Sequence, residues 1–375
     1  MSFLFITDIP TPYRMEMYNS IAKSLPELEV WYFQKKVVTR PWMLDPDKMK
    51  HKYWVAGGFY KRISTYNLFI NPHLVFKLLY TQPKDIILAA GWNDFDVICI
   101  IILKRLGLIR GRIGFWSEAN HLTLGASRDN ILKFLVRRFV YNACDGFQLI
   151  SGEMTRRTFE IWKIKKAEEI FFPNTIQEDI HKTKLDIGES KNPVKTGLPS
   201  ILISARLEEK YKGILNFLSS LSNDQLSRVQ IRIAGEGVDK ERINTLISKR
   251  GLQNNVILLG QLSEEEMAKA FSEADAFCLP SYSDPSPLTV IEALQWHLPL
   301  LISNHCGNHF EAVNEDKNGI TFSPLDSEEI SDAFDRFVDM EPQWNEMGLI
   351  SSKIFTDIFS KEKILNNFLE KIGAK

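Results

Sequence analysis

The feature that most constrains the fold is a repeated alternation of short apolar runs with helix-like segments along the chain. In the first half the strand-like runs are Phe3–Thr7, Leu28–Phe33, Asp85–Ala90, Arg112–Trp116, Gly146–Ile150 and Glu169–Phe172. In the second half they lie near residues 201–205, 229–234, 255–259, 275–279, 299–303 and 319–323. Such alternation is typical of stacked βα units with parallel sheets. The sequence therefore predicts an α/β fold.

The length of 375 residues favours two domains over one. From residue 174 the composition shifts to Asn, Gly, Pro and charged residues, which is typical of a linker. We predict an N-terminal domain over 1–175, a linker over 176–199, a C-terminal domain over 200–340 and a helical tail over 341–375. We expect the tail to pack back on the N-terminal domain.

The bulk composition indicates a globular protein of a reducing compartment. The hydrophobic fraction is 44% and the charged fraction 25%. The four cysteines are scattered without paired spacing, which favours a cytoplasmic location. The first residues lack the pattern of a secretion signal, and the longest apolar run, Val97–Leu103, is too short to span a bilayer. We expect no transmembrane segment.

One segment, Ser283–Leu294, combines the groups that a nucleotide-sugar site needs. Two carboxylates, Asp284 and Glu292, stand eight residues apart. Between them, Ser286 is predicted to cap a helix with Pro287 as its first residue, and the free N–H groups of such a helix start bind anions. The neighbours of Glu292 are apolar, so we expect its carboxylate to enter a cleft. A sugar, a diphosphate and a ribose would each find a partner here.

The segment resembles the two-acid signature of the retaining family-four glycosyltransferases, which have the GT-B fold. Other pieces of that family's C-terminal domain appear in the family's order. They are Ile201–Leu207 with Lys212-Gly213, Ile231–Gly237, Val256–Leu262 and Ala274–Ser281. The resemblance covers about residues 200–325 well and the first half of the chain loosely.

The resemblance implies two Rossmann-like domains facing each other across a cleft, with a UDP-linked sugar donor bound by the second. It assigns Glu292 to the ribose, Asp284 to the sugar hydroxyls, and Arg206 and Lys212 to the diphosphate. The remaining donor contacts that it implies are Gly235 and Gly237 in a close turn, Leu262 before the nucleobase loop, and Ser286, Leu288 and Thr289 at the helix start. Helix dipoles and basic side chains hold the diphosphate in this fold, so no metal or other cofactor is expected.

The chain departs from the family pattern at four positions. Asp284 replaces the usual glutamate and reaches one methylene less. Pro287 and His297 stand where glycine is common, and Asn308 replaces the second glycine of a later Gly-Gly-x-x-Glu element. These changes bear on the identity of the sugar more than on the class of reaction.

Two segments of the first half are candidates to face the same cleft. The loop Asp8–Arg14 follows the first strand and resembles a Pro-Tyr-Arg loop of family members that build polysaccharides. The segment Trp116–His121 follows another strand, and either Glu118 or His121 is a candidate to contact the transferred sugar or the acceptor hydroxyl. A plain turn at Asn120-His121 is an equal alternative.

Other chemistries lack essential parts. His305–His309 contains zinc-like residue types, but no nearby Cys or His completes four ligands. Gly235-Glu236-Gly237 lacks the third glycine of a dinucleotide fingerprint. Serine hydrolase, Walker-type NTPase and thiol protease motifs are missing from the sequence.

The sequence thus predicts a retaining hexosyltransferase that uses a nucleotide sugar and a glycan or lipid-linked glycan acceptor in bacterial surface polysaccharide synthesis, lipopolysaccharide O-antigen or capsule. Two alternatives stay open: a GT-B UDP-sugar 2-epimerase and a non-catalytic sugar-nucleotide-binding protein. Nucleic acid is not an expected partner.

Charge is distributed unevenly. Residues 1–180 hold 25 Lys and Arg against 18 Asp and Glu, a net of +7, and the remainder holds 21 against 29, a net of −8. A helix over 131–141 interleaves Lys133, Arg137 and Arg138 with apolar residues. An anionic membrane surface is therefore a candidate partner, at the inner face of the cytoplasmic membrane, with a core-packing helix as the alternative.

Overall fold

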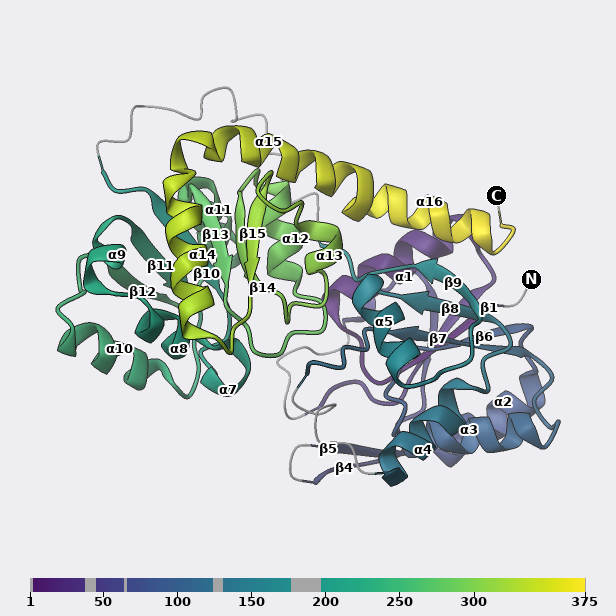
Figure 1. The fold of residues 1–375 in the computed structure, drawn as a ribbon. Helices are drawn as coiled ribbons and strands as arrows, with labels where there is room; N and C mark the ends of the chain where they lie inside the picture. The colour runs from purple at the N-terminus through teal and green to yellow at the C-terminus, as the bar shows by residue number, and fades with distance from the viewer. Residues whose placement is uncertain (1–2, 38–44, 64–65, 124–130, 177–196, 375) are drawn as a thin grey trace. The chain divides into compact units, whose positions relative to one another are not determined.

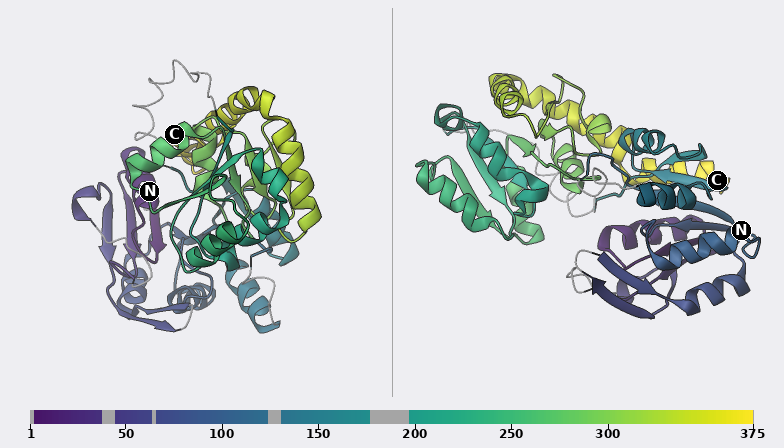
Figure 2. Two further views of the ribbon diagram at one scale, coloured as in Figure 1. Left: turned by 90° about the vertical axis from the view of Figure 1, so that its left-hand side faces the viewer. Right: turned by 60° about the horizontal axis from the view of Figure 1, so that its bottom comes forward.

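The structure is a computed structural model that describes residues 3–37, 45–63, 66–123, 131–176 and 197–374. Contacts within the chain divide it into two units (Figures 1 and 2). The first unit comprises Met1–Ala119, Arg128–Thr175 and Lys361–Lys375, and the second comprises Asn120–Ser127 and Ile176–Ser360. Each unit is built around its own sheet and is described by itself.

The first unit contains a seven-stranded sheet in the order β3-β2-β1-β6-β7-β8-β9, in which every pair of neighbours is parallel. Its strands are β1 (Phe3–Thr7), β2 (Leu28–Tyr32), β3 (Lys52–Val55), β6 (Asp85–Leu88), β7 (Arg112–Ser117), β8 (Phe147–Ile150) and β9 (Glu168–Phe171). All residues of β1, β6 and β8 are buried. Continuous apolar strands of this kind are expected where helices cover both faces of a parallel sheet.

Helices cover the two faces of this sheet. The helices are α1 (Pro12–Ser24), α2 (Pro72–Thr81), α3 (Phe95–Arg105), α4 (Ile131–Tyr141), α5 (Glu153–Ile161) and α16 (Lys361–Lys371). Helices α1 and α16 share one apolar cluster with the sheet, in which the Phe368 ring lies 5.8 Å from that of Phe3. The connection through α1 leads from β1 to β2, whereas those through α3, α4 and α5 lead from β6 to β9 in the opposite direction along the sheet. Because such crossovers are right-handed, α3, α4 and α5 lie on the other face. Helices α2, α3 and α4 lie side by side there (Figure 1).

Part of the first unit has no counterpart in the sequence-based prediction. Strand β3, helix α2 and an antiparallel hairpin of β4 (Phe59–Ile63) and β5 (Tyr66–Ile70) were not predicted. Strand β4 is largely exposed and mixes apolar with basic residues, so its pattern shows little of the apolar signal on which strand prediction depends. The short helical turn η1 (Pro46–Lys48) precedes β3.

The second unit contains a six-stranded parallel sheet in the order β12-β11-β10-β13-β14-β15. Its strands are β10 (Ser200–Ser204), β11 (Gln230–Ala234), β12 (Val256–Gly260), β13 (Ala276–Leu279), β14 (Leu300–Ser303) and β15 (Gly319–Phe322). Each of the six predicted strand positions in this half is confirmed to within two residues. The predicted α/β class is confirmed as well.

The helices of the second unit connect these strands and close the core. They are α7 (Glu209–Lys212), α8 (Ile214–Ser220), α9 (Asn223–Ser227), α10 (Lys240–Lys249), α11 (Glu264–Glu273), α12 (Leu288–Gln295), α13 (His309–Ala312), α14 (Ser327–Asp339), η2 (Glu341–Gln343), α15 (Trp344–Ile354) and the π-helical turn η3 (Phe355–Phe359). Capping boxes at Ser222 and Ser263 fix the starts of α9 and α11. The core packs aromatic residues of α8 and α14 on the sheet, with Phe217 6.1 Å from Phe334.

The strand order of the second sheet reverses between β10 and β13. From β10 the chain moves outward through β11 to β12, and from β13 it moves the other way through β14 to β15. In open α/β sheets such a reversal leaves a crevice at the carboxyl ends of the two central strands, where ligands bind. Residues just after β10 and β13 are therefore positioned for binding.

The two units divide the chain differently from the predicted domains at two places. Asn120–Ser127 groups with the second unit, and of the tail only Lys361–Lys375 groups with the first, where α16 packs on β9. The predicted linker lies largely outside the described residues. Within the described part of the chain, no helix has both the length and the apolar character needed to cross a membrane.

Candidate functional site

The segments that follow β10 and β13 are joined at the reversal of the second sheet. The backbone N–H of Ser283 donates to the carbonyl of Tyr211 at 3.0 Å, and this bond holds the α7 turn against the loop after β13. Gly213 follows with a left-handed backbone (φ +61°), and a Cβ there would lie 2.5 Å from the carbonyl oxygen of Pro280. Only glycine fits both conditions. Lys212 is thereby placed beside Asp284, and their side chains form an ion pair that is largely shielded from solvent.

A second contact holds Asp284 from the other side. Asp284 forms an isolated parallel bridge with Cys306, and the N–H of Gly307 donates to its carbonyl at 2.9 Å. A Cβ at Gly307 would lie 1.7 Å from the carbonyl oxygen of Pro285, so the two loops approach too closely for any side chain. The loop after β14 therefore fixes the backbone of the first acid.

The start of α12 differs from the prediction. Pro287, with φ −65° and ψ 119°, is the capping residue, and the helix begins at Leu288. The Pro287 carbonyl accepts from Val290 N–H at 3.3 Å and from the Asn308 side-chain amide at 3.0 Å. The bridge at Asp284 keeps the preceding chain extended, so the expected Ser286 cap is wrong. Within the described residues the buried Ser286 hydroxyl has no hydrogen-bond partner.

The first residues of α12 and the neighbouring Asn308 form the start of this helix. Leu288 and Thr289 are half-buried at the first two positions of α12, where backbone N–H groups have no acceptor within the helix. Asn308, which departs from the family pattern, ties the β14 loop to that helix start. The helix therefore offers free N–H donors next to the Lys212–Asp284 pair.

Glu292 lies on the second turn of α12, among buried residues. The side chain is half-buried, and burial raises the pKa of Glu292 to about 7. No cation or hydrogen-bond donor of the described chain offsets that burial. A carboxylate without a partner in such a place is a candidate for a ligand hydroxyl.

His297 ends the same helix in a left-handed conformation, with φ +58°. Its carbonyl oxygen faces Gly348, where a Cβ would lie 2.2 Å away. Glycine is the residue that adopts positive φ without strain, which explains in physical terms why the family favours it at this position. His297 therefore adopts a backbone conformation that favours glycine.

The glycine turn after β11 packs beside Arg206. Gly235 has φ +142°, and Cβ atoms at Gly235 and Gly237 would lie 1.9 Å from the Ala205 oxygen and 2.3 Å from the Leu207 oxygen. Both glycines are therefore required by the close approach of two backbone segments. Arg206 is exposed and its guanidinium pairs with Glu208 at 2.9 Å. Leu262 is half-buried just after β12, whose last residue, Gly260, accepts from the Gly235 N–H at 2.8 Å.

The predicted acid of the first half, Glu118, belongs to a polar cluster of the first unit. Its Oε1 accepts from the Asn174 amide at 2.5 Å, and its Oε2 lies 3.9 Å from Arg14 Nη2. Arg14 also donates to the Ala89 carbonyl at 2.9 Å and stacks over Trp116 at 4.6 Å. The Pro-Tyr-Arg segment forms the first turn of α1 and thus supplies the cation beside Glu118 at the carboxyl edge of this sheet.

The other candidate of that segment, His121, groups with the second unit. Next to it Asn120 is buried, and its side-chain amide donates to the carbonyls of His305 at 3.0 Å and Asp284 at 3.5 Å. Its Oδ1 accepts from Leu122 N–H at 2.9 Å, so the turn that was the alternative at Asn120-His121 is present. The role of Asn120 was not predicted, because nothing in the sequence marks which distant carbonyls an amide will bind.

The zinc-like run after β14 has structural partners. His305 Nδ1 lies 2.9 Å from the Tyr282 carbonyl, and His309 Nδ1 lies 2.7 Å from the Cys306 carbonyl. Both imidazoles hold loop backbone. Across the described residues, no group of three or more His, Cys, Asp or Glu side chains is arranged to hold a metal ion.

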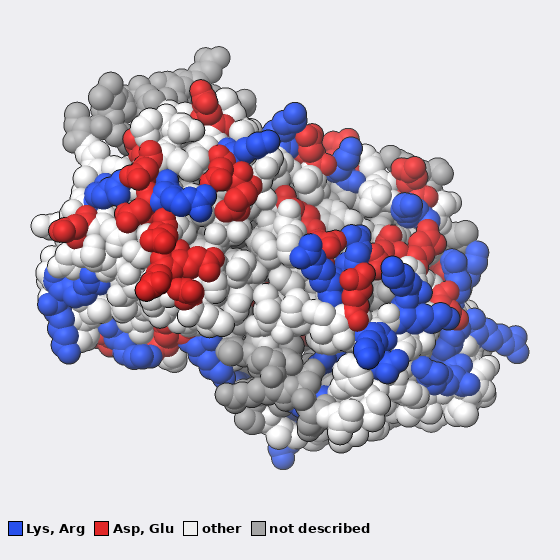
Figure 3. Space-filling model, viewed as in Figure 1, with Lys and Arg blue, Asp and Glu red and all other residues white. Residues whose placement is uncertain are grey.

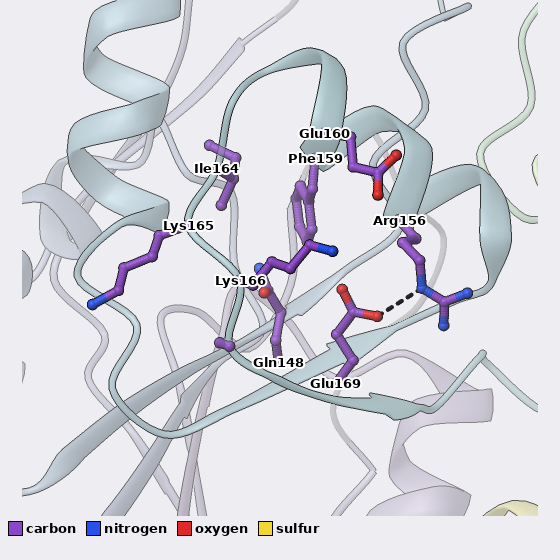
Figure 4. A pocket seen from close by; sticks show the side chains of 9 residues that line it. Gln148, Arg156, Phe159, Glu160, Ile164, Lys165, Lys166 and Glu169 are labelled. Carbon is purple, nitrogen blue, oxygen red and sulfur yellow. Dashed lines mark hydrogen bonds and ion pairs between the residues drawn. The ribbon is translucent and has the colours of Figure 1, made fainter.

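A separate pocket of about 300 Å³ lies in the first unit (Figure 4). Gln148 and Glu169, near the starts of β8 and β9, line it together with Phe159 and Lys166, and Glu169 pairs with Arg156 at 2.8 Å. The starts of parallel strands form the edge opposite to the one that carries Arg14 and Glu118. No residue predicted for the site lines this pocket.

Known proteins resemble this chain in sequence and in structure. The family model described as "Glycosyl transferases group 1" matches residues 187–351. The sulfoquinovosyl transferase SQD2 of Arabidopsis thaliana is 27% identical over 208 residues, which are 53% of this chain and 38% of that protein. A glycogen synthase of Mycobacterium tuberculosis is 25% identical over 199 residues, 47% of each. The matched part thus spans less than half the length of these relatives.

Solved structures extend the likeness to the whole chain. The lipopolysaccharide outer core galactosyltransferase WaaB has a TM-score of 0.74 at 15% identity, with 100% of this chain and 99% of that chain covered. HepE of Anabaena in complex with UDP has a TM-score of 0.71 at 16% identity, with both chains covered completely. At these identities the likeness establishes the fold. The chain has the GT-B fold, and its residues 187–351 match the model of the glycosyl transferases of group 1.

Proposed function

We propose that this protein is a retaining glycosyltransferase that moves a hexose from a UDP-sugar to a glycan or lipid-linked glycan acceptor. The bacterial surface polysaccharides, lipopolysaccharide O-antigen or capsule, are the products that we assign to it. The observation that carries the proposal is the Lys212–Asp284 pair beside the free start of α12, at the strand-order reversal of the second sheet. A cation, a carboxylate and helix N–H donors at such a crevice suit a sugar diphosphate.

In this proposal Lys212 and the start of α12 stabilise the diphosphate as it leaves. A lysine ammonium has three donors, so it can hold Asp284 and a phosphate oxygen at once. The bond from the anomeric carbon to the UDP oxygen breaks, the acceptor oxygen bonds to that carbon on the same face, and the acceptor proton passes to the departing phosphate. Stabilisation of the charge on the leaving group is then the largest catalytic contribution.

The other residues divide the donor between them. Glu292 would accept hydrogen bonds from the ribose hydroxyls, since burial favours any partner that lets its carboxylate stay charged. Asp284 would accept from the sugar hydroxyls, and Arg206, freed from Glu208, would add a second cation for the diphosphate. Gly235, Gly237, Leu262, Leu288 and Thr289 would line the donor, with no metal taking part.

Two features of other proteins support the donor class. HepE is described in complex with UDP and with UDP-glucose, and WaaB is described as a galactosyltransferase of the lipopolysaccharide outer core. We assign Arg14, Glu118 and Asn174 of the first unit to the acceptor, and His121 of the second unit is the alternative to Glu118. The protein would act in the cytoplasm, where its four unpaired cysteines suit the reducing conditions.

Incubation with a panel of radiolabelled UDP-sugars and an extract of lipid-linked glycans tests this function. We expect one sugar to enter the glycan fraction with release of UDP, and the transferred sugar to keep its anomeric configuration. Formation of the 2-epimer of the sugar nucleotide would make the protein an epimerase. Donor binding with no product for any sugar would make it a non-catalytic binding protein.

A further inference from the structure

Helix α4 turns a purely apolar stripe outward. Ile131, Leu132, Leu135 and Phe139 are between 38% and 72% exposed, while Val140 on the opposite side of the helix is buried. At 100° per residue these four positions fall on one side of the helix. A helix on the surface of a soluble protein normally presents charged or polar residues there. This stripe therefore needs a partner.

The neighbouring helices α3 and α2 continue the stripe. Ile102 and Leu106 of α3, and Phe76 and Tyr80 of α2, are between 43% and 91% exposed. Helix α3 contacts both α2 and α4, and the Arg105 guanidinium lies 4.6 Å above the Phe139 ring. We call the outward sides of these three helices the α2–α4 face. Such a continuous apolar surface marks an interaction site rather than scattered exposure.

The charges of the same helices are almost all positive. Helix α2 contributes one cation, α3 two and α4 three, against a single acid, so the net charge is +5. The cations are Lys77, Lys104, Arg105, Lys133, Arg137 and Arg138. Two of them are paired with acids outside these helices, Lys77 with Glu29 at 3.1 Å and Lys104 with Asp145 at 2.7 Å. The acid, Asp96, is buried and accepts from Asn71 at 2.7 Å. Where Figure 1 places these helices, the space-filling view shows white surface with Lys and Arg around it (Figure 3).

One part of the expected basic helix is corrected by the structure. Arg137 is buried, and its guanidinium lies 3.6 Å from the Trp162 ring and 4.9 Å from the Trp92 ring. Planar guanidinium groups stack well on aromatic faces, and this arginine therefore binds the core of the unit. Arg138 is half-buried beside the stripe, whereas Lys133 is half-buried on the side of the helix that carries Val140. The surface is apolar at its centre, with Arg105 and Arg138 at its flanks.

We propose that the α2–α4 face docks on the surface of an anionic lipid bilayer. The apolar stripe would enter the boundary between headgroups and acyl chains, and the flanking cations would lie at the phosphates. A second copy of the chain fits less well, because a symmetric pairing would bring the Arg105 and Arg138 cations of the two copies together. The docking is argued from the surface of the first unit alone. Only its biological role, which is to bring the protein to a lipid-linked acceptor, rests on the proposed function.

Sedimentation with vesicles tests the docking. The wild-type protein should pellet with phosphatidylglycerol vesicles much more than with phosphatidylcholine vesicles, and raised salt should weaken the binding because it screens the cations. The double variant Leu132→Glu, Leu135→Glu should lower the partition coefficient at least tenfold. Its matched control is Leu325→Glu, Leu349→Glu, which changes two exposed leucines of the second unit and should bind like the wild type.

Three companion measurements keep the result decisive. Thermal unfolding of both double variants should match the wild type, because all four side chains are exposed. A Leu135→Trp variant should show added fluorescence quenching by brominated lipids, and an absence of added quenching would overturn the insertion. Size-exclusion chromatography tests for pairing of two copies, and we expect no dimer through this face. A dimer that Leu132→Glu, Leu135→Glu dissolves, without vesicle binding, would make the face an interface between copies.

The proposed function and the docking can fail separately. UDP binding is measured in solution on wild type and on Leu132→Glu, Leu135→Glu, and equal affinities are expected because the donor residues lie in the second unit. Vesicle binding without UDP binding would reject the donor site and keep the docking surface. UDP binding by a wild-type protein that ignores anionic vesicles at low salt would reject the docking surface alone.

Discussion

The ammonium group of Lys212 and the carboxylate of Asp284 form an ion pair although the two residues are 72 positions apart in the chain. The pair joins the segments after β10 and β13, the two strands between which the sheet order reverses. The bond from Ser283 to Tyr211 and the bridge between Asp284 and Cys306 hold the two segments in place. The pair is thus preorganised by backbone contacts, which suits the role on a leaving diphosphate that we propose for it.

Replacement of Lys212 should impair turnover strongly. Lys212→Ala removes the cation that stabilises the leaving group, and loss of such a contact costs about 2–4 kcal/mol in the barrier, roughly 30- to 1,000-fold in kcat. The matched control is Lys210→Ala, which changes an exposed lysine of the same turn. Steady-state kinetics with the preferred UDP-sugar measure both. Equal rates for the two variants would remove Lys212 from the reaction.

The pKa of Glu292 predicts a pH dependence of stability. Burial raises this pKa from 4.5 to about 7, so the folded protein holds the proton in a range where the unfolded chain has lost it. The contribution of Glu292 to the free energy of unfolding therefore falls as pH rises from 4.5 to 7, by up to about 3 kcal/mol.

Glu292→Gln removes that titration. The difference in Tm between Glu292→Gln and wild type should grow as pH rises across this window and stay constant above it. The control Glu265→Gln changes an exposed glutamate of α11 in the same unit. A Tm difference for Glu292→Gln that does not vary between pH 4.5 and 8 would show that this carboxyl is not perturbed by burial.

Gly307→Ala should disrupt the two loops of the site. The added methyl group would meet the Pro285 carbonyl at 1.7 Å, so the segments after β13 and β14 must separate, at about 1–3 kcal/mol of stability. Turnover should fall more than stability suggests, since the same loop holds Asp284. Gly197→Ala is the control, because no atom of the described residues lies within 4 Å of its added Cβ. Thermal unfolding and kinetics compare the two variants.

Asn120 should act through the backbone that it binds. Asn120→Ala leaves the carbonyls of His305 and Asp284 without this donor, and a lost buried hydrogen bond costs about 1–3 kcal/mol. Asn120→Asp keeps the shape but not the donor, so it should lose as much turnover as the alanine variant. UDP affinity should stay near wild type in both. Full activity of Asn120→Asp would show that only the shape of the side chain matters.

The sequence sufficed for much of the second unit, because its strands are buried apolar runs and its polar residues follow them directly. The carboxyl ends of β10, β11, β13 and β14 collect Arg206, Gly235, Asp284 and His305, as alternation of strand and helix requires. The residues that follow a strand can be located from the sequence because the strand itself is predicted by its apolar run. The exposed hairpin β4–β5 shows the converse, since its residues carry no clear apolar period.

Contacts between side chains that are far apart in the chain could not be predicted from the sequence. Lys212 could be assigned to a phosphate but not to Asp284, because the pairing depends on how closely two loops approach. The Ser286 cap was wrong for the same reason, since the contact of Asp284 with Cys306 decides where the helix begins. Arg137 was expected to face lipid, yet Trp92 and Trp162 converge on it from distant segments. A local sequence pattern does not identify partners that come from distant segments of the chain.

Isothermal titration calorimetry of UDP binding tests the central claim most directly, that the crevice between β10 and β13 holds the nucleotide of the donor. We predict that wild type binds UDP and that Glu292→Gln weakens the affinity about tenfold, near 1.4 kcal/mol, because the hydrogen bonds to the ribose lose their charged acceptor. Asp284→Asn should bind free UDP almost as wild type does, since its partner is the sugar. Absence of UDP binding by wild type, or equal losses in the two variants, would contradict the account.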